Sequence, residues 1–364
     1  MRSSTATRCP STRKRWLTLV LTLLAAAAVS AQELTGDARR AFIRRAQIWT
    51  PTNVAAMDLR AGPQGPGAVP PGGTVRCEYV ERTLPGSTRK FYCAISPGDV
   101  VKVRYGPHNG EVEGAVLATR LLWALGFSAD RVYPARVACR GCSSDPWTNR
   151  KRVAGEQVFD PAAIERKPDG REMRYHGKAS GWAWAELDLV DASDGGAPVE
   201  QRDALKLLAV FMQHTDTKPY QQRLLCAPGG LTPDGACDTP LMALHDVGLT
   251  FGRANAFNRN ATASVNYAEW SRTPIWRDQT GCIGRLSKSV TGTLGDPAIG
   301  EGGRKFLADL LVQLSDRQLR DLFEVARVDL RRQGADSPAA ATIDEWVAAF
   351  KHKCDEIVTR RCPF

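Results

Sequence analysis

The chain has 364 residues, of which 43% are hydrophobic and 24% are charged, and its formal net charge is +10. A chain of this length and composition buries a large hydrophobic core, in one or two domains. Its basic residues are not interleaved with aromatic residues in a stripe, so the charge does not indicate a nucleic-acid-binding protein.

The first 31 residues have the pattern of a secretory signal peptide. Five basic residues and no acidic residue occur before the apolar run Trp16–Val29, and Val29–Ala31 is a small-x-small cleavage sequence. An uncleaved anchor is the alternative, although the run is short for a membrane span. We expect a leader over residues 1–31, a mature charge of +5 that suits a phosphate-containing ligand, and a secreted or periplasmic protein without stable membrane insertion.

Nine cysteines follow the leader, and eight of them lie in close pairs along the sequence. An oxidising compartment would let each pair close a local loop. A redox or metal-binding role is the alternative for Cys139 and Cys142, and the odd residue, Cys282, is expected to be free or joined to another chain. The expected disulfides are Cys77–Cys93, Cys139–Cys142, Cys226–Cys237 and Cys354–Cys362.

Residues 32–73 predict an N-terminal helix and then a linker or extended arm. The helical pattern covers residues 35–49, whereas residues 60–73 are dense in proline and glycine.

The next part, residues 74–180, is predicted to be rich in strands. Two β-rich runs around the turn Leu84–Thr88 form a plausible hairpin, and Asp99–Gly106 is a third strand. Apolar residues at helical spacing predict a helix within Asn109–Phe127.

A further strand is expected over Arg131–Cys139, followed by a polar and irregular region over residues 143–179. The last part, residues 181–364, is predicted to be helical, with a strong helix over Val199–His214 and a helical tail. Capping boxes mark two helix starts in the tail, at Ser315 and Thr342.

The sequence after the strong helix, His214–Gln221, resembles the catalytic loop of protein kinases, His-Arg-Asp-x-Lys-x-x-Asn. His214, Asp216, Lys218 and Pro219 match, whereas Thr215 and Gln221 stand where arginine and asparagine are usual. The alternative is that these residues are only the polar end of an amphipathic helix.

Two further motifs follow the kinase order. Asp246-Val247-Gly248 resembles Asp-Phe-Gly, whose aspartate binds magnesium. Upstream, Lys102 lies in the middle of a strand, and Glu113, or as an alternative Glu111, opens the next helix. Kinases place a phosphate-binding lysine and its glutamate partner in this way, although Lys102 could be a solvated strand residue and both glutamates suit a helix start.

Over residues 74–330 the chain therefore resembles the protein-kinase-like superfamily, in particular its atypical branch of lipid, HipA-type and secretory-pathway kinases. The resemblance implies an α+β, two-lobed fold with a small β-rich N-lobe and a larger helical C-lobe. It implies ATP and Mg²⁺ or Mn²⁺ as cofactors, and it leaves the acceptor open among a protein, a glycan, a lipid headgroup and a small molecule. The implied roles are catalysis for Asp216 and Lys218, nucleotide binding for Lys102, Glu113, Ser87 and Lys90, and metal binding for Gln221 and Asp246.

The chain also departs from the kinase pattern. The hairpin has no Gly-x-Gly-x-x-Gly, so Pro85–Lys90 would have to cover the phosphates, and Gln221 replaces the usual asparagine. A pseudokinase that only binds, or a nucleotidyl transferase on the same fold, are therefore the alternatives to an active kinase. Among the other candidates, His214 and His245 are expected to hydrogen-bond the loop backbone. Trp182 and Trp184 are expected to pack in the connector between the two lobes, or one of them to stack on adenine.

Overall fold

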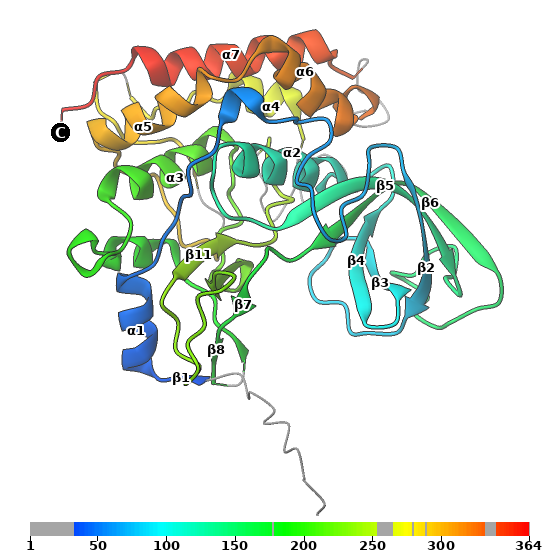
Figure 1. Ribbon diagram of the computed structural model, residues 1–364. Helices are drawn as coiled ribbons and strands as arrows, with labels where there is room; N and C mark the ends of the chain where they lie inside the picture. Colours follow the sequence, from blue (N-terminus) through cyan, green and yellow to red (C-terminus); the bar gives the residue numbers. More distant parts are fainter. Residues whose placement is uncertain are drawn as a thin grey trace, which may run out of the picture. The chain divides into compact units, whose positions relative to one another are not determined.

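The computed structural model describes residues 33–176, 178–252, 265–278, 280–287, 290–331 and 340–363, so the expected leader lies outside the described residues. Residues 31–364 form one compact unit, which combines helices and sheets (Figure 1). Two hydrophobic cores lie within it, a smaller one inside a barrel and a larger one among the helices. The predicted division at residue 180 stays a prediction. None of the described helices is both long and apolar enough for a membrane span.

A closed five-stranded barrel forms the β-rich part of the chain (Figure 1). The strands run in the order β2-β3-β4-β6-β5, with β2 and β5 parallel and the other neighbours antiparallel. Phe91, Tyr105 and Phe159 pack inside it, with ring centroids 4.9 to 5.4 Å apart. The strands are β2 (Thr74–Val80), β3 (Lys90–Ser96), β4 (Asp99–Tyr105), β5 (Arg131–Arg140) and β6 (Glu156–Arg166).

The predicted hairpin, the third strand and the strand after the helix are all present as β2 to β5. The prediction of an irregular region over residues 143–179 is wrong, because the 11-residue strand β6 lies within it and closes the barrel between β4 and β5.

Helix α2 (Glu111–Ala124) confirms the helix predicted after the third strand. Nearly every residue of α2 is buried, because the helix contacts the barrel on one side and α6 on another. Its Arg120 donates hydrogen bonds to the carbonyl oxygens of Leu59 and Arg60, 2.7 and 2.9 Å away. The proline- and glycine-rich arm is thereby attached to α2.

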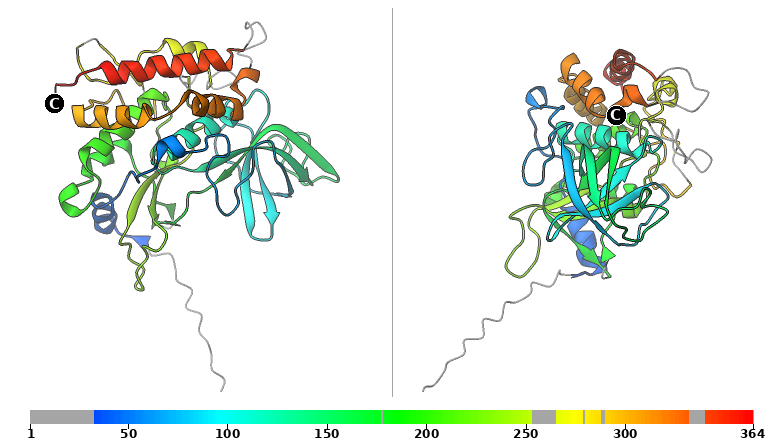
Figure 2. Two further views of the ribbon diagram at one scale, coloured as in Figure 1. Left: turned by 45° about the horizontal axis from the view of Figure 1, so that its top comes forward. Right: turned by 90° about the vertical axis from the view of Figure 1, so that its right-hand side faces the viewer.

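The remaining helices form the larger core. Helices α5 and α6 follow one another along α7 and both pack against it, and α3 packs against α5 (Figure 2). The predicted capping boxes begin α6 and α7, with Ser315 bound to Gln318 and Thr342 to Glu345. The helices are α1 (Gly36–Arg44), α3 (Val199–Phe211), α4 (Tyr267–Arg272), α5 (Glu301–Leu311), α6 (Asp316–Val325) and α7 (Ile343–Thr359).

Short strands and 3-10 turns lie between the barrel and the helices along the chain. One sheet joins β11, β10 and β7 in that order, and another joins β1, β8 and β9. These strands are β1 (Glu33–Leu34), β7 (Arg171–Glu172), β8 (Arg174–Tyr175), β9 (Lys178–Ala179), β10 (Gln222–Cys226) and β11 (Pro240–Leu244). The 3-10 turns are Val54–Ala56, Trp184–Leu189, Ala192–Asp194, Pro219–Gln221 and Val328–Leu330.

Three of the four expected disulfides are present: Cys77–Cys93, Cys139–Cys142 and Cys226–Cys237. The fourth prediction is wrong, because Cys362 pairs with Cys282 and the buried Cys354 is the free thiol. These disulfides are compatible with an exported protein.

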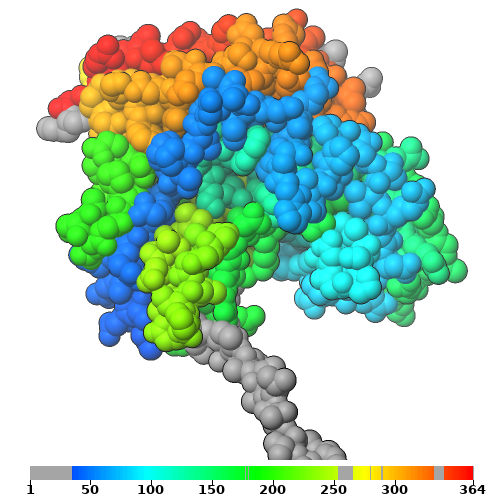
Figure 3. All heavy atoms as spheres, in the orientation of Figure 1, coloured from blue at the N-terminus to red at the C-terminus, as the bar shows by residue number. Residues whose placement is uncertain are grey.

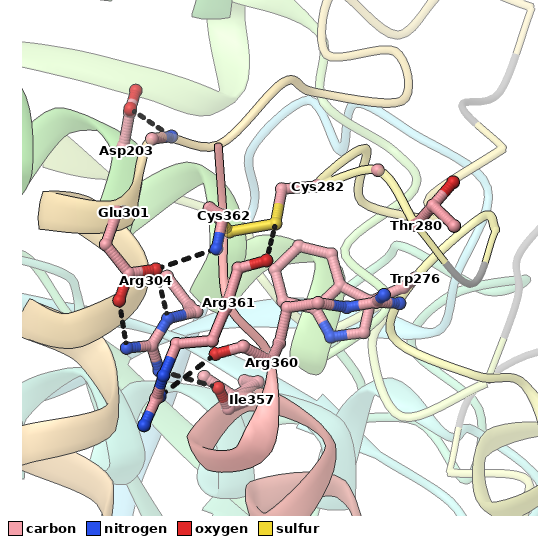
Figure 4. Close-up of a disulfide and its surroundings, with 12 residues drawn as sticks. Asp203, Trp276, Thr280, Cys282, Glu301, Arg304, Ile357, Arg360, Arg361 and Cys362 are labelled. Atoms are coloured by element: carbon pink, nitrogen blue, oxygen red, sulfur yellow. Dashed lines mark hydrogen bonds and ion pairs between the residues drawn. A yellow bond between two sulfur atoms is a disulfide. The ribbon is translucent and has the colours of Figure 1, made fainter. Parts of the chain in front are cut away.

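The Cys282–Cys362 disulfide fastens the end of the chain (Figure 4). Beside it, the backbone N–H of Cys362 donates to Glu301, 2.9 Å away, and Glu301 is held in turn by Arg304. This network ties the segment after α7 to the start of α5.

Candidate functional site

A pocket of about 690 Å³ brings barrel residues together with residues that follow α3 and β11. On one face, the surface is hollowed between the barrel strands, in cyan, and the segment carrying β10 and β11, in yellow-green (Figure 3). Basic side chains outnumber acidic ones around the pocket, which favours an anionic ligand. The charged lining residues are Arg82, Lys90, Lys102, Arg131, Arg166, Lys167, Arg223, Glu165 and Asp246.

Strand pairing explains why several of these side chains share one face. Phe91 and Val103 are buried in the barrel core, so their neighbours Lys90, Lys102 and Arg104 project to the other side of the pleat. Lys90 lies opposite Arg104 in the register. The outer face of β3 and β4 therefore carries three cations toward the pocket and α2.

The partner of Lys102 is Glu165, which lies opposite it on β6 and forms an ion pair with it. The predicted pairing with Glu113 is therefore wrong, and so is its alternative with Glu111. Burial would raise the pKa of Glu165, but the Lys102 and Arg104 charges outweigh this and lower that pKa to about 2.

Glu113 lies away from the pocket and pairs with Arg331 at 3.3 Å. Burial raises the pKa of Glu113 to about 7, against the opposing effect of Arg331. Glu113 and Glu111 have different partners because they lie on different faces of α2. Two residues along a helix turn the side chain by roughly 200°, so the two glutamates cannot face the same partner.

Arg104 is the centre of the site, a role that the sequence did not predict for it. Its guanidinium contacts Glu165 at 2.9 Å, Asp246 at 2.5 Å and also Glu111, and its side chain is almost fully buried. Burial opposes ionisation of Arg104, but Asp246 and Glu165 outweigh it and raise its pKa. The sequence did contain a signal for this role, because Arg104 lies two residues after Lys102 on β4 and therefore projects from the same face of the strand.

Asp246 follows β11 and has a left-handed backbone, with φ of 59°. Burial would raise the pKa of its carboxyl group, yet Arg104 and Lys102 hold that pKa well below its usual range. The residue is therefore a carboxylate held in the pocket by an arginine.

Helix α2 packs directly on the turn after Asp246. A Cβ at Gly114 would overlap the carbonyl oxygen of Gly248, and a Cβ at Gly248 would lie 2.9 Å from the Cβ of Glu111. Glycine at both positions lets the two backbones approach this closely.

Lys90 lies almost fully buried at the start of β3. Burial and the nearby Arg104 lower the pKa of Lys90 to about 8. The turn before it covers its ammonium group, since a Cβ at Gly86 would lie 2.8 Å from Nζ. Ser87 on the same turn is exposed and does not line the pocket.

The loop His214–Gln221 is fixed by its own side chains. Asp216 lies 2.5 Å from the Lys218 ammonium and accepts a hydrogen bond from the Gln221 amide, 2.9 Å away. The Gln221 carbonyl oxygen accepts the Lys218 backbone N–H at 2.9 Å. The loop lies beside Asp246, because His245 N–H donates to the Gln221 backbone oxygen, but of its residues only Tyr220 lines the pocket.

These contacts bear on the two predicted metal ligands. Both ends of the Gln221 amide are engaged within the loop, so Gln221 does not fit a metal ligand in this arrangement. Asp246 fits better. Arg104 holds only its Oδ1, and its Oδ2 accepts no hydrogen bond from the described residues.

The two histidines differ from the expectation that they bind the loop backbone through their rings. His214 is fully buried, and neither ring nitrogen has a hydrogen-bond partner in the described parts of the chain. Burial lowers the pKa of His214 to about 4. The His245 ring instead contacts the buried carboxylate of Asp130, with Nδ1 2.5 Å from Oδ2.

The aromatic residues of the site also divide into two kinds. Trp182 and Trp184 are fully buried and pack on each other within the larger core, which confirms the expected packing role. Tyr220 is 65% exposed and lines the pocket. It is therefore the aromatic ring of the loop that a ligand can reach.

Comparison with known proteins gives little guidance. No family model matches the chain, and no curated protein matches it. Among solved structures, the chain is similar to the proinflammatory kinase CtkA of Helicobacter pylori, with a TM-score of 0.41 and 11% identity over 80% of this chain and 97% of that one. A similarity at this level decides neither the fold nor the activity.

Proposed function

We propose that this protein is an exported phosphotransferase with a protein-kinase-like fold, which transfers the γ-phosphoryl group of ATP to a hydroxyl group. The observation that supports it best is the pocket, which joins Lys90 and Lys102 of the barrel to Asp246 at the end of β11. Cations on two strands opposite a carboxylate are the groups that a metal-bound triphosphate requires.

Lys102 and Lys90 would bind the phosphate oxygens, with the turn at Gly86 covering them. Lys102 is neutralised by Glu165 and held near Arg104, so the phosphates compete with Glu165 for its ammonium group. Glu113 has no direct role, and Ser87 would act only if its turn moved toward the phosphates.

Asp216 would orient the acceptor hydroxyl, and Lys218 would offset charge on the transferred group. Asp216 and Lys218 lie beside the pocket rather than in its lining. This position suits residues that would contact an acceptor bound at the edge of the pocket. The exposed Tyr220 ring would contact the nucleotide base or the acceptor.

A magnesium ion, when bound, would offset the phosphate charge. Asp246 is the predicted ligand whose contacts fit this role, whereas Gln221 would have to release both Asp216 and Lys218. Catalysis then depends mainly on positioning and electrostatics.

The second candidate is a binding protein that uses the same pocket without catalysis. The contact of Arg104 with Asp246 favours it, since the arginine already neutralises the carboxylate to which a metal ion would bind. A nucleotidyl transferase on the same fold is a third candidate, and it would use the α-phosphate.

Purified protein with intact disulfides, incubated with ATP labelled at either phosphate and with Mg²⁺ or Mn²⁺, separates these candidates. We expect label from the γ-phosphate to appear in the product and to be lost in Asp246→Ala and Lys102→Met. Asp309→Ala removes an exposed carboxylate from α5 and should leave transfer unchanged.

Label from the α-phosphate alone would indicate nucleotidyl transfer. Nucleotide-induced thermal stabilisation without transfer of label would support the binding protein. If no label is transferred and the nucleotide does not stabilise the protein, every nucleotide-based candidate is contradicted.

A further inference from the structure

Three side chains outside the predicted kinase motifs converge at the wall of the pocket, and two of them line it. One ligating atom from each of Asp130, Glu165 and His245 lies within 4.8 Å of the others. The His245 Nδ1 atom is 2.5 Å from Asp130 Oδ2 and 3.9 Å from Glu165 Oε1. Glu165 and His245 line the pocket, whereas Asp130 is buried behind them.

The backbone holds these residues in place from three separate segments. Asp130 donates its backbone N–H to Leu244, the last residue of β11, at 3.1 Å. His245 follows directly and donates its N–H to Gln221. Glu165 is fixed opposite Lys102 in the barrel. The cluster is therefore built by packed elements rather than by loose surface side chains.

One atom of the cluster lacks a partner. Asp130 is 3% exposed, and its Oδ1 accepts no hydrogen bond from the described residues. A buried carboxylate oxygen without a donor is costly, and a cation beside it would remove that cost.

We propose that Asp130, Glu165 and His245 bind a divalent first-row transition-metal cation, with further coordination positions open to the pocket. Three protein ligands with open positions are typical of metal sites that also meet a substrate. A modest separation of His245 from Asp130 makes room for the ion, since ligand atoms 2.5 Å apart are too close for bonds of about 2.1 Å at a regular angle.

The ligand types select the ion. Mg²⁺ and Ca²⁺ take oxygen ligands, whereas an imidazole nitrogen with two carboxylates suits Mn²⁺ or Zn²⁺. This site is distinct from the predicted metal ligands Gln221 and Asp246. Substitution of His245 should therefore weaken binding of this ion, whereas substitution of Gln221 should not.

Lys102 is the competitor for this site. Its ammonium group contacts Glu165, so it stands where a cation would meet that carboxylate. Metal binding therefore releases Lys102 into the pocket, where an anionic ligand can reach it. The site does not depend on the proposed phosphotransfer, because the ion binds without nucleotide.

Titration of the full mature chain with Mn²⁺ in the absence of nucleotide, followed by the loss of the free-ion EPR signal, tests the site. We expect one Mn²⁺ per chain, at least about tenfold weaker binding in His245→Gln and Asp130→Asn, and weak competition by Mg²⁺. His352→Gln, on the exposed side of α7, should bind as the wild type does.

Lys102→Met should change the Mn²⁺ affinity in the direction opposite to His245→Gln and Asp130→Asn. Removal of the competing ammonium group should tighten Mn²⁺ binding, whereas a merely structural cluster would not respond. Far-UV circular dichroism and thermal unfolding show whether Asp130→Asn still folds, and His245→Gln carries the test if it does not.

Absence of Mn²⁺ binding by the wild type, or equal affinity in His245→Gln, would overturn the proposal. Intact Mn²⁺ binding without transfer of phosphate label would contradict the proposed function and leave the metal site standing.

Discussion

The Asp246 carboxylate lies 2.5 Å from the Arg104 guanidinium, which also contacts Glu165 and Glu111. One arginine on β4 thus meets a carboxylate from β6, one from the start of α2 and one from the turn after β11. This side chain therefore contributes to the charge balance at three places that are far apart in the sequence.

Arg104→Met should therefore be strongly destabilising. Three carboxylates would lose a buried partner, and breaking a buried ion pair in this way typically costs 3–5 kcal/mol, or about 4 kcal/mol here. Urea denaturation measures the loss. Arg317→Met, whose side chain is 93% exposed, should change the free energy of unfolding by less than about 0.5 kcal/mol. Equal stability of the two variants would show that the cluster does not need Arg104.

His214 should make the folded state sensitive to acid. Its pKa is lowered from 6.5 to about 4 by burial, so the unfolded chain takes up a proton near pH 6.5 while the folded chain does not. The stability due to neutral His214 is thus present above pH 6.5 and is lost as the pH falls toward 4, by an amount on the order of 3 kcal/mol. Denaturation of wild type and His214→Gln at several pH values checks this. The free energy of unfolding of the variant should fall less steeply than that of the wild type between pH 6.5 and 4. If the two proteins lose stability in parallel over this range, His214 is not the group responsible.

Gln221→Ala should destabilise the protein without any added metal. The Gln221 amide makes one hydrogen bond to Asp216 and one to the Lys218 backbone, and two such bonds contribute about 2 kcal/mol. Thermal or urea denaturation with and without Mg²⁺ measures this. A metal ligand would instead show an effect that depends on the cation. Gln313→Ala, an exposed glutamine, serves as the matched control.

The Cys282–Cys362 disulfide should contribute more stability than Cys139–Cys142. Their sequence separations are 80 and 3 residues, and the loop-entropy relation gives about 4.5 and about 1.6 kcal/mol. Paired Cys→Ala variants compared by denaturation test this order. Alkylation of the unfolded, unreduced chain followed by peptide mapping should modify Cys354. Modification of Cys282 instead would contradict the pairing.

Local signals in the sequence predicted much of the fold. The hairpin, the third strand, α2 and both capping boxes were found because a turn, a period or a cap lies within a few residues. Strand β6 was missed because its sequence, which includes Asp160 and Pro161, looks polar and broken. Its role in closing the barrel comes from pairing with distant strands.

The site was predicted only in part, for the same reason. Lys90, Lys102 and Asp246 do line one pocket, but the partner of Lys102 is Glu165, 63 residues away, rather than the glutamate on the next helix. Likewise, Cys362 pairs across 80 residues, whereas the prediction relied on the nearest cysteine. Contacts of this range leave no periodic signal in a single sequence.

The contact between Gly114 and Gly248 has a mechanical consequence. There is no space for even a methyl group between α2 and the turn that follows Asp246, so the two segments cannot slide past each other without first separating. A displacement of the start of α2 would carry the Asp246 carboxylate with it. The opposite wall, where the turn at Gly86 covers Lys90, is joined to the start of α2 by a side-chain contact instead, since Thr88 Oγ1 donates to Glu111 Oε2 at 2.9 Å. Widening of the pocket there would require this hydrogen bond to break.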